Sequence, residues 1–211
     1  MQGQSFPCRL FTLLAVLFVA IGLVAWPAAA AEKGMLDMLK EVAKEKGVLG
    51  VASFDVQGNL LLPEGYRQWV FVGAPVTPND MNGGKAAFPE FHHVYIDPGS
   101  FKQYQETGKF RDGTVIVKEL VSVGAKKGAS GNGYFPGEFT GLAVSVKNSV
   151  RFANEPGNWG YFGFDAGDGK SPMPPAKVQP TEACSPCHQK NAAQDLIFTQ
   201  YYPVLRAAKP K

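Results

Sequence analysis

Hydrophobic positions along the chain gather into five short runs that are rich in β-branched and aromatic residues, a pattern typical of β-strands. These runs predict strands at 66–73, 91–96, 114–123, 139–147 and 159–165. Segments rich in Gly, Pro and polar residues separate them, and we expect loops at 75–84, 126–133 and 166–180. Short strands joined in this way favour an antiparallel sheet.

Helical spacing of apolar residues appears at both ends of the chain. A short helix is predicted over 35–46, and a helical turn over 100–107 has Ser100 as its N-cap. From Cys184 onward the chain is predicted to be helical, with Pro203 interrupting the helix. Its core-facing residues are expected to be Leu196, Ile197, Tyr201, Val204 and Leu205. The fold class is therefore α+β, an antiparallel sheet flanked by helices.

The first 31 residues have the layout of a secretory signal peptide. One charge, Arg9, precedes a long apolar run, and four consecutive alanines follow it. We expect cleavage after Ala30 or Ala31, which would leave one domain over 32–211 and remove Cys8, although an uncleaved membrane anchor stays an alternative.

Composition adds two exclusions. The chain has 45% hydrophobic residues, enough for a folded core, so wholesale disorder is excluded. Its net charge of +3 is too small for the basic surface of a nucleic-acid-binding protein.

The most specific motif is Cys184-Ser185-Pro186-Cys187-His188, the C-x-x-C-H signature of c-type haem attachment. Two thiols at this spacing bond to the two vinyl groups of one haem, and the adjacent His188 ligates the iron. A redox-active cysteine pair and a small disulfide loop are the alternatives. We therefore expect one covalently bound haem c.

The position of the motif near the C-terminus restricts the sixth iron ligand, because no Met or His follows His188. The iron is then either five-coordinate, which suits small-ligand binding or catalysis, or ligated from upstream. An electron-transfer protein would use His92, His93 or Met81 as the sixth ligand.

Several segments resemble the cytochrome P-460 family: GYRQWVFVG at 65–73, GKFRDGTVIVKELVSVG at 108–124, RFANEPGNW at 151–159 and TEACSPCH at 181–188. The resemblance covers the chain from about Leu60 to Lys209. It implies a periplasmic homodimer with a five-coordinate haem that oxidises hydroxylamine to nitrous oxide or nitric oxide. It also implies a redox partner such as a small soluble cytochrome, and a third covalent bond to the haem from Lys118.

Strand alternation places Lys118 on the same side as Ile116 and Leu120, an apolar face. A buried lysine there is costly unless its charge is paired or removed, and a bond to haem would remove it. The alternative is an ordinary lysine that extends to water.

Two further positions bear on the reaction. His92 matches a site where a relative carries a basic residue in the distal pocket, so we expect it to act as the distal acid or base. Ala143 occupies the position of the family's glutamate, and Glu138 has the wrong strand parity to replace it. The alternative function is therefore a nitric-oxide-binding or detoxifying cytochrome of the related c-prime-beta type, which lacks the lysine bond.

Aromatic residues are candidates for packing on both sides of the haem. Those expected near the distal side are Phe88, Tyr134 and Phe135. Those expected on the proximal side are Phe198, Tyr201 and Tyr202.

Overall fold

A computed structural model describes residues 33–38, 51–167 and 173–210 of the chain. Residues 33–38 are helical and belong to a first unit, which ends at Met38. The rest of the helix predicted over 35–46, and the predicted signal peptide, lie outside the described residues. In the ranges described, no helix is long and apolar enough to cross a membrane.

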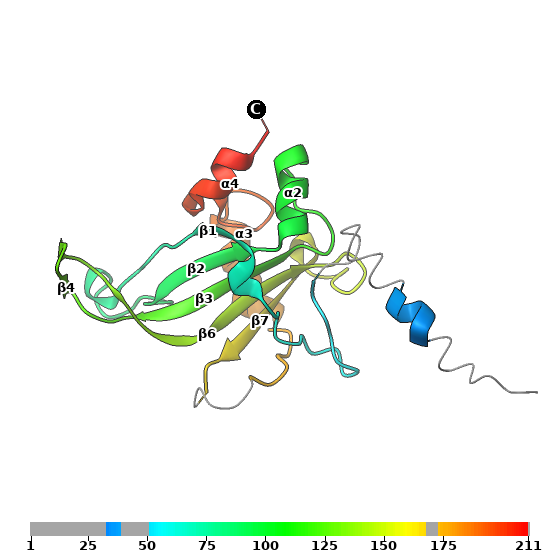
Figure 1. The fold of residues 1–211 in the computed structure, drawn as a ribbon, viewed down its shortest axis with the longest axis horizontal. Helices are drawn as coiled ribbons and strands as arrows, with labels where there is room; N and C mark the ends of the chain where they lie inside the picture. Colours follow the sequence, from blue (N-terminus) through cyan, green and yellow to red (C-terminus); the bar gives the residue numbers. More distant parts are fainter. Residues whose placement is uncertain (1–32, 39–50, 168–172, 211) are drawn as a thin grey trace, which may run out of the picture. The chain divides into compact units, whose positions relative to one another are not determined.

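The second unit is built on a five-stranded sheet whose strands pair in chain order, each antiparallel to its neighbour (Figure 1). Its strands are β1 (Val70–Gly73), β2 (Phe91–Ile96), β3 (Val115–Val123), β6 (Pro136–Lys147) and β7 (Trp159–Asp165). A separate two-stranded hairpin consists of β4 (Lys127–Gly128) and β5 (Gly131–Asn132). The sheet confirms the predicted α+β class and its antiparallel order.

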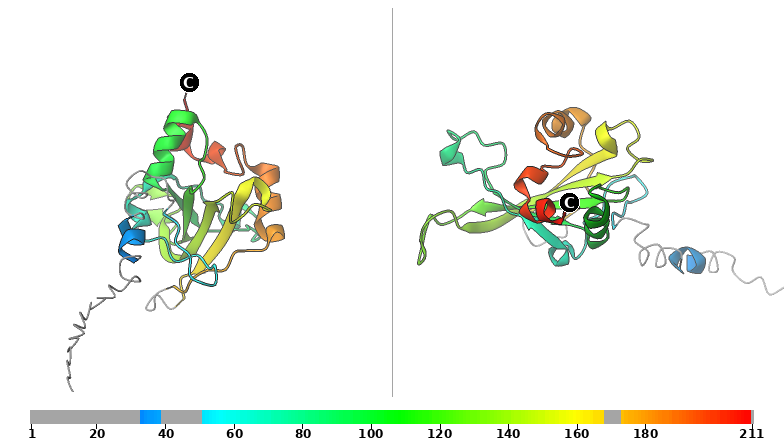
Figure 2. Two further views of the ribbon diagram at one scale, coloured as in Figure 1. Left: turned by 90° about the vertical axis from the view of Figure 1, so that its right-hand side faces the viewer. Right: turned by 90° about the horizontal axis from the view of Figure 1, so that it is seen from above.

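Helices are few and short. In the described part of the second unit, the α-helices are α2 (Pro98–Thr107), α3 (Thr181–Asn191) and α4 (Pro203–Ala208). The 3-10 turns are η1 (Tyr66–Gln68), η2 (Asn79–Met81), η3 (Pro156–Asn158) and η4 (Thr199–Tyr201). The helix α3 lies against one face of the sheet, and the segment that leads into β1 lies against the other (Figure 2).

Both faces of the sheet are packed, because β3 alternates between two apolar clusters. Val115 and Val117 belong to the first cluster, with Leu60 and Tyr66 from the segment before β1. Ile116 belongs to the second, with residues from the C-terminal third of the chain. Members of that second cluster are Val94, Ile96, Trp159, Tyr161, Ile197, Tyr202 and Leu205, with Cys184 packed against them. We call this second side the α3 face.

Three of the predicted elements differ from the structure. The strand predicted over 66–73 begins as the 3-10 turn η1, because Gly65 adopts a left-handed φ of 65° and turns the chain before β1. The loop predicted over 126–133 forms the β4–β5 hairpin. The segment 166–180 was predicted to be a surface loop, but Ala176 in its described part is buried. Ala176 and Leu60 exchange two backbone hydrogen bonds of 2.8 Å.

Helix boundaries also differ at two points. The N-cap of α2 is Asp97, whose side chain accepts a hydrogen bond from the Ser100 N–H at 2.8 Å, so Ser100 lies inside the helix. Pro203 begins α4 rather than interrupting a helix, because proline is tolerated in the first turn. Of the residues predicted to face the core, Ile197 and Leu205 are buried, whereas Tyr201 is exposed.

Candidate functional site

The helix α3 carries the whole C-x-x-C-H motif. Cys184 and His188 are four residues apart and therefore share one side of the helix. Cys184 is half-buried against the cluster on the α3 face, Cys187 is exposed, and both are free thiols. The arrangement leaves both sulfur atoms available for thioether bonds.

His188 is held in one orientation by its surroundings. Its Nδ1 lies 2.7 Å from the Leu196 carbonyl oxygen, which only accepts, so Nδ1 donates and Nε2 keeps a lone pair. The rings of Tyr161 and Phe198 flank it, with centroids at 4.5 Å and 4.8 Å. Burial lowers the pKa of His188, which favours the neutral form that ligates metals. Phe198 thus packs directly against the histidine of the motif.

Lys118 projects from β3 on the α3 face, far from the motif in sequence. Its Nζ lies 3.7 Å from the ring centroid of Phe88. Burial is the main cause that lowers the pKa of Lys118 to about 8, while Glu90 and the two motif cysteines, Cys184 and Cys187, act in the opposite direction. The amine therefore lies within electrostatic reach of both motif cysteines, at a place where its charge is disfavoured.

The two adjacent histidines of β2 lie on opposite faces of the sheet. His92 pairs with Leu120 and so shares the α3 face with Lys118, whereas His93 pairs with Glu119 on the other face. The Nε2 of His92 is 3.3 Å from the Phe88 carbonyl oxygen, to which it donates. Burial, followed by the charge of Lys118, lowers the pKa of His92 to about 4.

The upstream ligands considered for a six-coordinate iron are thus separated. His93 lies on the face away from α3, with its Nδ1 3.7 Å from Glu119 Oε2. Met81 ends η2 with 72% of its surface exposed. Of the three candidates, His92 alone shares a face with the motif helix.

Small residues lie beside Lys118 on the β6 and β7 side of the sheet, whereas its partner on β2 is Val94. Ala143 of β6 is the direct cross-strand partner of Lys118, and Gly163 of β7 is the partner of Ala143. A Cβ added at Gly163 would lie 3.8 Å from Gln179 Nε2, an ordinary contact distance, so a small side chain would fit there without a clash. Glu138 is exposed beyond an irregularity in the β3–β6 pairing and does not supply a carboxylate here.

The sequence that carries the motif helix and Lys118 matches a known protein family. A sequence model of the family described as Cytochrome P460 matches residues 63–199, well over half of the chain. The chain belongs to the cytochrome P460 family. No curated protein matches the chain. The matched range contains every candidate residue, from His92 to His188, and membership of this cytochrome family implies a haem cofactor.

The residues of this cytochrome P460 chain fit a haem. In addition to the thiol pair and the free Nε2 of His188, the hydroxyl groups of Tyr161 and Ser185 are buried without a hydrogen-bond partner. Buried polar atoms normally have partners, so their orphaned state suits a bound group with a polar edge. Elsewhere in the described ranges, no group of three or more His, Cys, Asp or Glu residues is placed to hold a bare metal ion.

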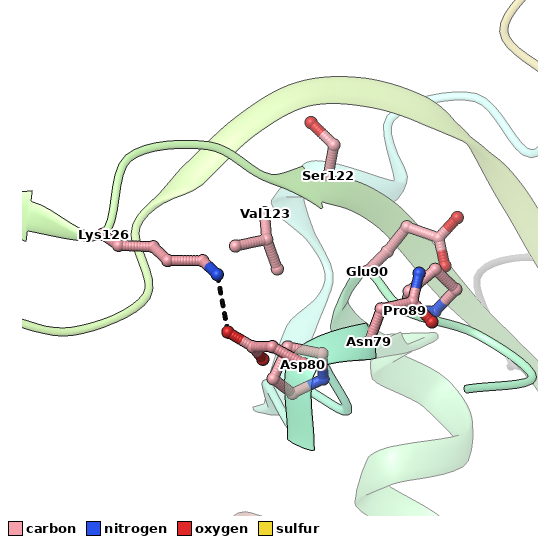
Figure 3. A pocket seen from close by; sticks show the side chains of 8 residues that line it. Asn79, Asp80, Pro89, Glu90, Ser122, Val123 and Lys126 are labelled. Carbon is pink, nitrogen blue, oxygen red and sulfur yellow. Dashed lines mark hydrogen bonds and ion pairs between the residues drawn. The ribbon is translucent and has the colours of Figure 1, made fainter. Parts of the chain in front are cut away.

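A cavity of about 330 Å³ lies where the loop before β2 meets the end of β3. Glu90 and Lys126 approach it from opposite sides, and the Lys126 Nζ lies 2.6 Å from Asp80 Oδ2 (Figure 3). The Oε2 atom of Glu90 is buried without a partner. Sequence reasoning did not find Glu90, which lies in the loop just before β2 begins at Phe91, where strand alternation does not apply.

Proposed function

We propose that the protein is a periplasmic c-type haem oxidoreductase that oxidises hydroxylamine to nitrous oxide or nitric oxide. In this proposal Cys184 and Cys187 would hold one haem through thioethers, His188 would ligate a five-coordinate iron, and Lys118 would form a third covalent bond to the macrocycle. The predicted signal peptide over 1–31, a homodimeric state and electron transfer to a small soluble cytochrome belong to the same proposal.

The observation that carries this proposal is the position of Lys118. Its amine lies in electrostatic reach of both motif cysteines, and its pKa is lowered to about 8. About a tenth of such amines are neutral at pH 7, far more than for an ordinary lysine. A neutral amine has the lone pair that a bond to a haem carbon requires, so burial prepares Lys118 for bonding. That bond would replace one N–H and one C–H bond, and the two protons and two electrons released would pass to solvent and to an oxidant such as peroxide or dioxygen.

When bound, haem would supply an iron that binds the substrate nitrogen and accepts its electrons. The chain must then accept protons. His92 donates from Nε2 to the Phe88 carbonyl, so its Nδ1 carries the lone pair and can accept a proton. With a pKa of about 4, His92 is neutral at pH 7 but weakly basic, which limits its efficiency as a general base.

A second function is favoured by one specific observation. Ala143 places a methyl group, and no carboxylate, directly across from Lys118. A protein without an efficient proton acceptor at this point would bind small ligands at an open iron without rapid turnover. The alternative is therefore a nitric-oxide-binding cytochrome of the c-prime-beta type.

Turnover of the purified holoprotein distinguishes the two functions. Hydroxylamine is added anaerobically with an artificial oxidant, and nitrous oxide and nitric oxide are measured as products. The proposed enzyme consumes hydroxylamine only when the oxidant is present. The apoprotein of the Cys184→Ser/Cys187→Ser variant, separated from any residual haem, does not consume it. Tight nitric oxide binding with no hydroxylamine consumption would instead support the alternative.

A further inference from the structure

A strained turn lies directly after the motif helix. Gln194 and Ile197 exchange two backbone hydrogen bonds, of 3.3 Å and 2.8 Å, around the central residues Asp195 and Leu196. Both central residues have positive φ, 46° and 60°, which is the requirement of a type I′ turn. Glycine usually occupies such a position, and a leucine there is unfavourable. Contacts from outside the turn must therefore hold it.

Lys147 and Trp159 supply these contacts by binding the side chain of Asp195, and we call these three side chains the clamp. Lys147 Nζ lies 3.1 Å and 3.0 Å from the two carboxylate oxygens of Asp195 and 2.7 Å from the Gly157 carbonyl oxygen. Trp159 Nε1 donates to Asp195 Oδ1 at 3.3 Å. The Lys147 side chain is only 16% exposed, so water screens this ion pair less than a pair on the surface.

The turn also receives support on its other side. The Tyr104 hydroxyl donates to Gln194 Oε1 at 3.1 Å, and Gln194 Nε2 donates to the Gly108 carbonyl. The backbone of the turn is thus fixed to β6, β7 and the α2 region at once. A backbone conformation with positive φ persists when its surroundings determine it in this way.

The fixed turn presents one group to the motif. The Leu196 carbonyl oxygen accepts the hydrogen bond from His188 Nδ1 at 2.7 Å. The position of this oxygen depends on the Leu196 backbone, whose positive φ the clamp maintains. The orientation of the His188 ring, and the electron density on its Nε2, therefore depend on residues that do not touch it.

We propose that Lys147 and Asp195 are positioning residues for His188, acting through the strained Asp195–Leu196 turn. The inference rests on the proposed role of His188 as the iron ligand. A strong hydrogen bond from Nδ1 makes the imidazole a better donor, strengthens its bond to iron and stabilises the ferric state. Loosening the turn weakens that hydrogen bond.

Asp195→Asn is the principal test, because asparagine tolerates positive φ and can still accept from Trp159, so only the ion pair is lost. Lys147→Met is the second variant, since it keeps the apolar stem. Lys102→Met, at an exposed site on α2, is the matched control. Resonance Raman spectra of the reduced holoproteins and their midpoint potentials are compared, together with haem content and circular dichroism.

The expected result is full haem content, an iron–histidine stretching band shifted to lower wavenumber, and a raised midpoint potential in both test variants. Leu196→Gly added to Asp195→Asn restores both readouts, because glycine adopts positive φ without a clamp. Band and potential unchanged from wild type in the folded variants would overturn the positioning role alone. Absence of an iron–histidine band in the wild-type protein would overturn the assignment of His188, and this inference with it.

Discussion

Lys118 of β3 and Ala143 of β6 are direct cross-strand partners, so their side chains project side by side from the α3 face. Directly paired residues of an antiparallel ladder have Cβ atoms about 4.5–5.5 Å apart. The resemblance seen in the sequence implies a glutamate at the position of Ala143, and this expectation motivates the first prediction. The chain thus combines the proposed cross-linking lysine with a methyl group where a proton acceptor is expected.

Replacing this alanine by an acid tests its importance. Ala143→Glu is expected to raise kcat for hydroxylamine oxidation by about 100-fold, the lower end of the usual contribution of a positioned general base. Ala143→Gln has nearly the same shape but cannot take up a proton at neutral pH, so it should leave kcat unchanged. Steady-state assays with an artificial oxidant measure both. A wild-type rate equal to that of Ala143→Glu would show that no carboxylate is needed at this position.

Removing the amine of Lys118 separates haem attachment from haem tuning. Lys118→Met keeps the apolar stem of the side chain and should retain haem through Cys184 and Cys187. Its absorption spectrum should become that of a haem held by two thioethers alone, because a third bond distorts the macrocycle. Lys127→Met, at an exposed site on β4, is the control and should keep the wild-type spectrum. Identical spectra for the two variants would count against the third bond.

The lowered pKa of His92 predicts a pH dependence of stability. Its folded-state pKa is about 4, against about 6.5 in the unfolded chain. Between these values the unfolded chain binds a proton that the folded chain does not, so the free energy of unfolding falls as pH falls through this window. A shift of this size corresponds to about 3 kcal/mol at most, and the partial exposure of His92 to water makes the loss smaller than that. Burial is the larger cause, so the direction holds even if a haem bond removes the charge of Lys118.

Denaturant unfolding of matched variants at pH 7, 5.5 and 4 measures this contribution. His92→Gln should be less sensitive to acid than the wild-type protein, by no more than the stated amount. His93→Gln, on the opposite face, should keep the wild-type dependence on pH. If His92→Gln and the wild-type protein lose stability in parallel, the imidazole of His92 is not buried in its neutral form.

Glu119, next to Lys118 but on the opposite face, should matter for stability rather than for the haem. It is 5% exposed and accepts hydrogen bonds from the Tyr66 hydroxyl at 2.8 Å and from Arg67 Nε at 2.8 Å. Glu119→Gln should lower the free energy of unfolding by about 1 kcal/mol, because the amide oxygen still accepts from Tyr66 and Arg67 but no longer carries the charge that strengthens both hydrogen bonds. Glu138→Gln, at an exposed site, is the control and should change stability by less than about 0.5 kcal/mol. Equal unfolding midpoints for the two variants would contradict the prediction.

Local patterns were enough to predict much of the fold. The run FHHVYI predicted β2 with its observed bounds, because four of its six residues are β-branched or aromatic hydrophobic residues, which favour strands. Residues 66–68 were wrongly placed in a strand. Their conformation is decided by the left-handed Gly65 and by contacts with Glu119, more than fifty residues away in sequence.

The site divides in the same way. The C-x-x-C-H motif is local and was predicted from spacing, and alternation correctly placed Lys118 with Ile116 on one face. The ion pair of Lys147 with Asp195 was not predicted, because the two residues are 48 positions apart in the sequence. The turn that carries Asp195 was not predicted either, because its second central residue is a leucine, which rarely adopts positive φ. Glu90 was likewise missed, since only the folded loop brings it to the cavity.

The central claim is that Lys118 and the C-x-x-C-H motif hold the same haem. Mass spectrometry of the protease-digested holoprotein tests it most directly, with Lys118→Met digested in parallel. We predict that the peptide containing Lys118 and the peptide containing Cys184 to His188 travel together, joined through one haem, in the wild-type digest only. A free Lys118 peptide, with haem retained on Cys184 and Cys187, would contradict the account and favour the nitric-oxide-binding function.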